Sequence, residues 1–323
     1  MTTKKNKLLF AVSAGILILL YLMSSTNLII RDKKTEVFPI SVIVEDTSDE
    51  DYEKLRKGMD RAAEEFHVDL NFITLYKPND QEQQLQLISR EIADGAKAVV
   101  LSPAKPAQAQ IGLEEMVLNS PLILLGNLIP AQQVMAGISI DFQEAGRMLG
   151  RAARENSSEI PVYLLTQGLE YGYAQAIYDG ILQELEPYGY SVTLYPTASE
   201  KDGQRLLGEL EASQKKAVWI AMDENSLETA AGIMGDSSIY RGNVPALYGI
   251  GGTTRMLNAL DRGIIRGLVV HNWFDEGYLS IAKAVSAIEG ESREKEEIVM
   301  EAHYITKEDL RDTTYEKMLY PID

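Results

Sequence analysis

The polar residues best suited to binding a ligand lie in the loop Glu45–Asp51, which holds five acidic residues and no basic one. Carboxylates accept hydrogen bonds from hydroxyl groups and attract cations, and a loop this acidic disfavours a phosphorylated or strongly anionic ligand. The acids do not follow the spacing of a calcium-binding loop. At least one of Ser48, Asp49 and Asp51 is expected to cap the following helix, because side-chain oxygens satisfy free backbone N–H groups there.

Five aromatic residues fall just beyond the expected ends of strands: Tyr52, Tyr171, Tyr173, Trp273 and Phe274. Aromatic rings stack on the apolar faces of sugars and line small-molecule pockets, although each ring taken singly can equally be a packing residue. In an open α/β sheet, ligands bind outside the carboxyl ends of the strands. The acidic loop and the rings are therefore expected to share one cleft.

The sequence offers no set of catalytic residues. His67, His271 and His303 show no metal-ligand spacing, and the zinc-protease, nucleophile-elbow and Walker patterns are absent. The stretch Gly249–Thr254 superficially resembles a dinucleotide-binding loop but lacks its third glycine, which favours a tight turn between strand and helix. No pair of acids can be assigned as general acid and general base. We expect no enzyme activity, no cofactor and no bound metal.

Length and composition narrow the class of protein. The 323 residues are enough for about two domains. The net charge of −17 repels phosphate backbones, so nucleic acid is not an expected partner. The chain has no cysteine, which excludes disulfides, thiolate metal sites, a cysteine nucleophile and a lipid-modified N-terminal cysteine.

The N-terminal segment predicts a single membrane anchor. Lysines in residues 1–7 precede an uncharged run from Leu8 to Ile30, and about 20 apolar residues span a bilayer. Ser24–Thr26 is a poor signal-peptidase site, so an uncleaved anchor is preferred over a cleaved signal peptide. Residues 1–7 are expected to be a cytoplasmic tail, and the rest of the chain, after a linker over 31–37, to lie outside the cytoplasm.

Beyond the linker, strands alternate with amphipathic helices in two successive runs. This order predicts an α/β protein with two doubly wound, Rossmann-like parallel sheets. Continuous β-branched runs such as Ile40–Val44 suit buried parallel strands. The expected strands are Ile40–Val44, Val68–Leu75, Ala98–Leu101, Leu122–Leu125 and Met135–Ile140, then Val162–Thr166, Ser191–Tyr195, Ala217–Ala221, Ala246–Ile250, Gly267–Val270 and Ile298–Tyr304.

The order and spacing of several stretches resemble the type 1 periplasmic sugar-binding proteins, the ribose-binding-like group, over roughly residues 38–304. The opening strand, polar loop and helix are similar, and so are the turn before the last sheet strands and the segment that crosses between lobes. The stretches are Ile40–Phe66, Ile92–Pro103, Ile138–Gly150, Tyr178–Leu182, Ala217–Leu227 and Tyr248–Thr253.

This resemblance implies the periplasmic binding protein type 1 fold, with two lobes joined by three crossovers and closing over one ligand. It implies an N-terminal lobe of 38–141 plus 272–297, a C-terminal lobe of 142–271 plus 298–316, and a tail of 317–323. It implies no catalytic residues.

The same resemblance implies where the ligand binds, and several of those positions depart from the family pattern. Gln175 stands where the family usually has a ligand-binding arginine, Met222 replaces an asparagine, Gly251 replaces an aspartate, and Gly126-Asn127 replaces an Asp-Arg pair. Because glutamine cannot replace a bidentate arginine, we expect a different ligand, bulkier or less polar than a free pentose or hexose, or a loss of tight binding. The expected ligand-binding residues are Asp46, Asp51, Tyr52, Asn127, Asp141, Tyr171, Gln175, Met222, Gly251, His271 and Asn272.

The expected function is that of a membrane-tethered, extracytoplasmic solute-binding protein for a carbohydrate. Closure of the lobes on the ligand would present it to an ABC permease or signal to a sensor histidine kinase. Two alternatives remain open: the effector-binding domain of a lactose-repressor-like regulator, and an enzyme on a doubly wound fold.

Overall fold

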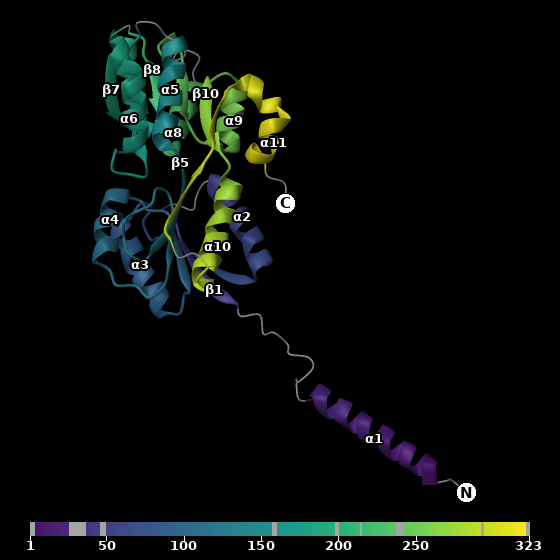
Figure 1. Ribbon diagram of the computed structural model, residues 1–323. Helices are drawn as coiled ribbons and strands as arrows, with labels where there is room; N and C mark the ends of the chain where they lie inside the picture. The colour runs from purple at the N-terminus through teal and green to yellow at the C-terminus, as the bar shows by residue number, and fades with distance from the viewer. Residues whose placement is uncertain are drawn as a thin grey trace. The chain divides into compact units, whose positions relative to one another are not determined.

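The computed structural model describes residues 4–25, 37–45, 50–156, 160–197, 200–213, 215–236, 242–291 and 294–320. The chain forms two compact units, Met1–Val37 and Phe38–Asp323 (Figure 1).

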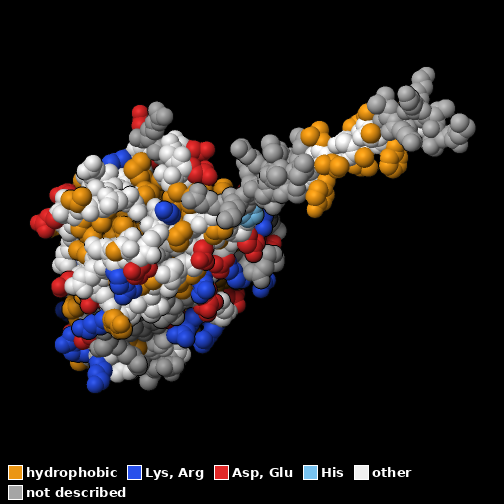
Figure 2. All heavy atoms as spheres, turned by 90° about the horizontal axis from the view of Figure 1, so that it is seen from below, with side chains coloured by type: hydrophobic (Ala, Val, Ile, Leu, Met, Phe, Trp, Pro, Cys, Tyr) orange, Lys and Arg blue, Asp and Glu red, His pale blue; other side chains and the backbone are white. Residues whose placement is uncertain are grey.

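The first unit contains the helix α1 (Lys4–Ser25). The consecutive residues Ile16–Tyr21 are each more than half exposed, and because they cover more than one helical turn, apolar surface lies on every side of this part of the helix. Figure 2 shows orange, hydrophobic side chains on the face of α1 that is in view. Among the described residues, no helix combines the length and the apolarity needed to cross a membrane. The last part of the expected anchor and most of the linker, residues 26–36, lie outside the described residues.

The second unit contains two six-stranded sheets, each the core of one lobe. The first sheet has the order β11-β5-β4-β3-β1-β2, and all its pairs are parallel. Most of its strands are continuous apolar runs buried on both faces, as a parallel sheet between two helix layers requires. The strands are β1 (Phe38–Ile43), β2 (Val68–Ile73), β3 (Ala98–Leu101), β4 (Leu122–Leu125), β5 (Val134–Ile140) and β11 (Glu296–Met300).

Four helices cover the first sheet, two on each face. The helices α2 (Glu50–Phe66) and α10 (Trp273–Glu289) pack on one face, where Val100 of β3 points. The helices α3 (Gln81–Ala93) and α4 (Pro106–Glu115) pack on the other, together with Val99. Successive residues of one strand thus enter two different cores.

The second sheet has the order β12-β10-β9-β8-β6-β7. Its pairs are parallel except that β12 runs antiparallel to β10, which departs from the expected wholly parallel sheet. The strands are β6 (Val162–Thr166), β7 (Val192–Pro196), β8 (Val218–Ala221), β9 (Leu247–Ile250), β10 (Gly267–His271) and β12 (Ala302–Ile305).

Helices also cover both faces of the second sheet, and two separate apolar cores result. One face carries α5 (Phe142–Asn156) and α6 (Ala174–Leu185), which leads into the 3-10 turn η1 (Glu186–Tyr188). The other face carries α7 (Glu200–Ser213), α8 (Glu224–Asp236), α9 (Thr254–Asp261), η3 (Lys307–Arg311) and α11 (Thr313–Leu319). The helix α9 follows the turn Gly249–Thr254, as expected for a tight turn between strand and helix, and its N-cap is Thr253, whose hydroxyl accepts from Met256 N.

The chain passes between the two sheets three times: from β5 to α5, from β10 to α10, and from β11 to β12. The expected single strand Ile298–Tyr304 is wrong, because it is divided at Glu301 between the two sheets. Residues 298–300 pair with β5, so the expected lobe boundary at 297/298 assigns them to the wrong lobe. The alternation of strands and helices along a sequence does not reveal where one strand ends and the next strand joins the other sheet.

Two helix pairs approach closely through glycines. A Cβ on Gly58 of α2 would lie 1.9 Å from the carbonyl oxygen of Phe274 in α10, and one on Gly277 would lie 2.0 Å from that of Leu55. The same arrangement joins Gly146 of α5 to Gly180 of α6. Because glycine has no side chain, the backbones of the two helices in each pair can touch.

Candidate ligand-binding cavity

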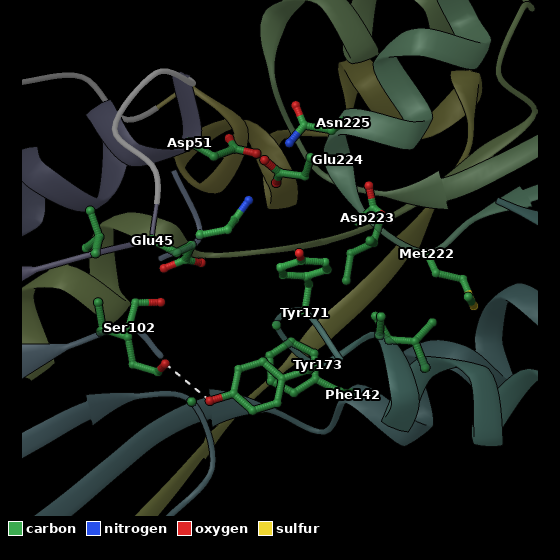
Figure 3. Close-up of a pocket in the computed structure, with 18 of the residues that line it drawn as sticks. Glu45, Asp51, Ser102, Phe142, Tyr171, Tyr173, Met222, Asp223, Glu224 and Asn225 are labelled. Carbon is green, nitrogen blue, oxygen red and sulfur yellow. Dashed lines mark hydrogen bonds between the residues drawn. The ribbon is translucent and has the colours of Figure 1, made fainter. Parts of the chain in front are cut away.

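A cavity of about 230 Å³ lies between the two lobes, where residues at the carboxyl ends of strands from both sheets meet (Figure 3). The first lobe contributes Val44, directly after β1, and Leu125, the last residue of β4. The second lobe contributes the residues at or just after the ends of β6, β8, β9 and β10: Gln167, Met222, Ile250 and His271. This is the edge at which parallel sheets bind ligands.

Five aromatic side chains line the cavity: Tyr52, Phe142, Tyr171, Tyr173 and Trp273. The rings of Phe142 and Tyr173 are stacked, with centroids 4.1 Å apart and planes 8° from parallel. The ring of Trp273 lies 4.2 Å from that of His271. The walls are thus broad apolar surfaces from both lobes. Phe274, the fifth aromatic residue noted in the sequence, is not among the lining residues.

Tyr173 reaches from the second lobe into the first. It precedes α6, and its hydroxyl donates a hydrogen bond to the carbonyl oxygen of Leu125 at 3.4 Å (dashed in Figure 3). Gly126 leaves room for it, because a Cβ there would lie 1.3 Å from the hydroxyl oxygen. Burial, aided by the negative charge of Glu45, raises the pKa of the Tyr173 hydroxyl far above its ordinary value. Tyr173 is therefore a neutral wall of the cavity at physiological pH.

Five carboxylates also line the cavity: Glu45, Asp51, Asp223, Glu224 and Glu276. Asp223 accepts hydrogen bonds from the backbone N–H groups of Gln167 and Ser226, each at 2.9 Å, and so caps α8 while fixing the loop after β6. Glu276 Oε2 lies 2.8 Å from His271 Nε2, and both residues are more than nine-tenths buried. Figure 3 shows Glu45 and Asp51 entering from the first lobe and Asp223 and Glu224 from the second.

At one rim of the cavity, the first turn of α2 bonds to the loop before α9. Asp51 accepts from Gly252 N at 2.9 Å, and Lys54 donates to Gly252 O at 2.7 Å. Glu50 accepts from Thr254 N at 2.7 Å. Acidic residues of the first lobe thus satisfy free N–H groups at the start of a helix in the second lobe.

A second set of contacts joins the lobes elsewhere along the cavity. Gly172 N donates to Ala104 O at 2.9 Å, and the ammonium of Lys105 lies 4.5 Å from the ring centroid of Tyr171. Together with the Tyr173 hydroxyl, these contacts bring the two lobes into direct bonding on more than one side of the cavity.

The structure brings five of the predicted site residues to the cavity and leaves five others away from its lining. Asp51, Tyr52, Tyr171, Met222 and His271 line it. The remaining described residues have other partners: Asn127 accepts from Ser139, Asp141 caps α5 through Glu144 N, Gln175 donates to Asp179, Asn272 caps α10 through Asp275 N, and Gly251 has a φ of +131° in the turn after β9. Asp46 lies outside the described residues.

Several lining residues were not among the predicted set. Asp223, Glu224 and Asn225 follow β8 directly, so their place beyond a strand end could have indicated them, whereas Met222 was expected from the family resemblance. Phe142 follows the crossover residue Asp141 and is the first residue of α5, and nothing in the sequence distinguishes it from any other residue at the start of a helix. Glu276 had no sequence signal, because its link to His271 depends on the turn into α10.

Within the part of the chain that the structure describes, no group of three or more His, Asp or Glu side chains is arranged to hold a metal ion. Rings and hydrogen-bonding groups dominate the lining instead. The cavity is chemically suited to enclosing a small organic molecule and to orienting it by stacking and by carboxylate acceptors.

Two α/β lobes, three crossings between them and a cavity at the strand ends define a bilobed α/β protein with a candidate ligand site between its lobes. The chain belongs to the family of periplasmic binding protein domains, whose model matches residues 40–292. A search of curated proteins returned no match.

Solved structures share the fold at low sequence identity. A carbohydrate transporter solute-binding protein from Agrobacterium radiobacter, in complex with D-arabinose, is 19% identical with a TM-score of 0.76, over 88% of this chain and 99% of that one. GanP, a glucose-galactose binding protein from Geobacillus stearothermophilus, is 17% identical with a TM-score of 0.75, over 85% and 99%. An ABC transporter solute-binding protein from Bacillus halodurans with bound myo-inositol is 20% identical with a TM-score of 0.74, over 86% and 97%.

Proposed function

We propose that this chain binds a carbohydrate or a carbohydrate derivative between its two lobes and acts as a solute-binding protein, not as an enzyme. The observation that carries the proposal is the cavity itself, in which five aromatic rings and five carboxylates line a space between lobes of this family's fold. Rings of this kind stack on the apolar faces of sugars, and carboxylates accept bonds from their hydroxyl groups. The solute-binding proteins of similar fold carry sugars or a cyclic polyol.

The test uses the full chain, purified in detergent, in a thermal-shift screen against neutral pentoses, hexoses and cyclic polyols. A true ligand raises the melting temperature with concentration, because it binds the folded state. Calorimetry then compares Tyr171→Ala, in the cavity, with Tyr76→Ala, whose side chain is 96% exposed and not part of the lining. We expect Tyr171→Ala to lose about tenfold or more in affinity and Tyr76→Ala to lose none. Absence of binding by every carbohydrate would overturn the proposal.

We further propose that the N-terminal segment tethers the protein to the cell membrane with the two lobes outside the cytoplasm. The support is the apolar surface around α1, since a helix that is apolar on all sides needs an apolar environment. A variant lacking residues 1–36 should move from the membrane fraction to the soluble fraction. Retention of the truncated chain in alkali-washed membranes would contradict the tether.

The downstream partner is proposed to be an ABC permease or a sensor histidine kinase, to which the closed form binds. Cross-linking and co-purification from cells with and without ligand treatment would identify which of these two partners the protein binds. The alternatives of a repressor-like regulator and an enzyme have less support. The net charge of −17 opposes nucleic-acid binding, and the described cavity residues have no assigned nucleophile or acid–base pair.

A further inference from the structure

The polar groups of the cavity divide into those that the fold already uses and those that it leaves available. Asp51, Asp223 and Glu276 each form a hydrogen bond with another residue of the protein. Two further carboxylates, Glu45 and Glu224, also interact within the protein. An ionised carboxylate can only accept hydrogen bonds, whereas a sugar hydroxyl both donates and accepts them. A bound sugar therefore needs donors that none of the five carboxylates can supply.

Three uncharged side chains of the lining can supply these donors: Ser102, Gln167 and Asn225. The hydroxyl of Ser102 and the two carboxamides form no hydrogen bond with any residue that the structure describes. Each of these groups can donate and accept, as a sugar hydroxyl does. Ser102 belongs to the first lobe and Asn225 to the second, and both are labelled in Figure 3. The uncommitted donors thus come from both lobes.

The backbone of Ser102 is held in place by the fold, although its side chain is not used. Its N–H donates to Ile43 O at 2.9 Å, and its carbonyl oxygen accepts from the fully buried side chain of Gln84 at 2.8 Å. The same carboxamide of Gln84 accepts from Ala104 N at 3.0 Å. Because the loop is fixed before a ligand arrives, the Ser102 hydroxyl can bind with little loss of conformational entropy.

The backbones of the other two residues are fixed by one carboxylate of the second lobe. Asp223 accepts from Gln167 N and from Ser226 N, each at 2.9 Å. The second of these bonds caps α8, whose first turn contains Asn225. Asp223 therefore positions both carboxamides, while the carboxamides themselves stay available to a ligand.

The strand topology gives an independent reason to expect a ligand at these side chains. In the first sheet, β1 and β3 are neighbours, but the chain leaves them in opposite directions, toward β2 and toward β4. In the second sheet, the same is true of β6 and β8, which lead to β7 and β9. Ligands of open α/β sheets bind in the crevice at such a point. Ser102 directly follows β3, Gln167 directly follows β6, and Asn225 comes shortly after β8.

Resting on the proposed binding function, we propose that Ser102, Gln167 and Asn225 are the residues that determine which sugar is bound, by hydrogen bonding to its oxygen atoms from both lobes. None of the three was among the residues expected from the family pattern. The aromatic rings stack on the apolar faces of the sugar, and these three side chains distinguish the positions of its hydroxyl groups. A sugar that binds Ser102 and the carboxamides together also joins the two lobes.

The test is calorimetry on the full chain in detergent with D-arabinose, D-glucose, D-galactose and myo-inositol. Gln167→Met removes the carboxamide but keeps the length of the side chain. Gln86→Met makes the same change at an exposed glutamine of α3 outside the lining. We expect Gln167→Met, Ser102→Ala and Asn225→Ala each to weaken binding of the tightest of these probes by about 2- to 10-fold, and Gln86→Met to leave it unchanged.

A second measurement separates direct recognition from an indirect effect on the fold. It uses monodeoxy derivatives of the tightest probe, each of which lacks one hydroxyl group. The derivative without the hydroxyl that Gln167 binds should lose affinity for the parent but not for Gln167→Met, because the same hydrogen bond cannot be lost twice. Without sugar, Gln167→Met should melt as the parent does, since its carboxamide has no partner among the described residues.

The outcomes separate this inference from the proposed function. Unchanged affinity in any of the three variants overturns the role of that residue. An equal loss in Gln86→Met, or the same loss for every monodeoxy derivative in Gln167→Met as in the parent, overturns direct recognition by Gln167. In all these cases the parent still binds a carbohydrate, so the proposed function stands. A parent that binds none of the four probes counts against both.

Discussion

The carboxylate of Asp51 accepts a hydrogen bond from the backbone N–H of Gly252 at 2.9 Å, across the boundary between the lobes. The residues lie 201 positions apart in the sequence, and Lys54 reinforces the contact by binding both of them. The closed arrangement of the lobes is therefore held in part by groups of the protein itself. Under the proposed function, ligand binding would add to these contacts and would not supply all of the free energy of closure.

The first prediction is that Asp51→Ala shifts the unliganded protein toward an open arrangement. Loss of a charge-assisted bond costs about 1.5–3 kcal/mol, which changes the open-to-closed ratio by about 10- to 100-fold. Because the chain has no cysteine, spin labels can be placed at Ser89→Cys and Glu209→Cys, on exposed positions of α3 and α7. Electron–electron resonance should show a longer and broader distance between the labels.

The matched control for this measurement is Glu53→Ala, which removes an exposed acid from the same turn of α2. Its label-to-label distance should equal that of the parent. If Asp51→Ala gives the parent distance as well, the bond to Gly252 does not hold the lobes together.

The second prediction concerns Gly126, which has a φ of +136° and faces the Tyr173 hydroxyl. Gly126→Ala should destabilise the protein by about 2–5 kcal/mol, because backbone strain and overpacking add. Gly95→Ala is the control: its φ is +111°, but nothing lies within 4 Å of the new Cβ, so it should cost about 1–3 kcal/mol from strain alone. Urea unfolding measures both.

A double-mutant cycle isolates the contact between these residues. Combining Gly126→Ala with Tyr173→Ala should recover at least about 0.5 kcal/mol relative to the sum of the single changes. Simple additivity would show that Tyr173 does not occupy the space above Gly126.

The third prediction is a pH dependence that arises from Tyr173. Its pKa is raised in the folded state, so its contribution to stability is fully present below about pH 10, the unfolded value, and is lost as the pH rises further. The variant Tyr173→Phe has no hydroxyl group that could ionise. The variant should be less stable than the parent by about 0.5–1.5 kcal/mol near neutral pH, and this difference should shrink or reverse above about pH 10.

The measurement is urea unfolding of both proteins at a series of pH values. Tyr304, whose pKa is also raised by burial, is present in both and cancels in the comparison. A difference that stays constant across the alkaline range would contradict a buried, titrating Tyr173.

The fourth prediction tests the backbone contact between α2 and α10. Gly58→Ala should destabilise the protein by about 1–3 kcal/mol, because the new Cβ meets the Phe274 carbonyl. Gly208→Ala, on an exposed position of α7 with nothing within 4 Å, should instead stabilise it by about 0.5–1 kcal/mol. A lower melting temperature for Gly58→Ala and a higher one for Gly208→Ala would confirm the distinction. An unchanged melting temperature for Gly58→Ala would show that the helices can move apart.

Much of the fold could be predicted from the sequence, because its determinants are local. Buried parallel strands are continuous apolar runs, and three of them, β3, β4 and β6, have the expected bounds. Residue type and position allow either Asn79 or Asp80 to cap α3, and the structure shows that Asp80 does so, by accepting from Gln83 N. The antiparallel β12 and the division of the last strand depend on partners far along the chain, which no local pattern shows.

The cavity was only partly predictable, because polar residues after strands have two competing roles. Asp141 and Asn272 follow strands, as ligand-binding residues do, but each caps the helix that comes next. Asp51 was expected in a loop, yet it lies in the first turn of α2 and bonds to the other lobe. Only the packing of the two lobes decides which carboxylates face the cavity.

The place of β11 in the sheet has a consequence for how the protein is made. This strand forms the edge of the first sheet beside β5, although residues 296–300 follow almost the whole second lobe in the chain. During synthesis the β5 edge remains without its partner until these residues have emerged, and an unpaired edge is a template for pairing with other chains. The first sheet therefore cannot be completed until almost the whole second lobe has been synthesised.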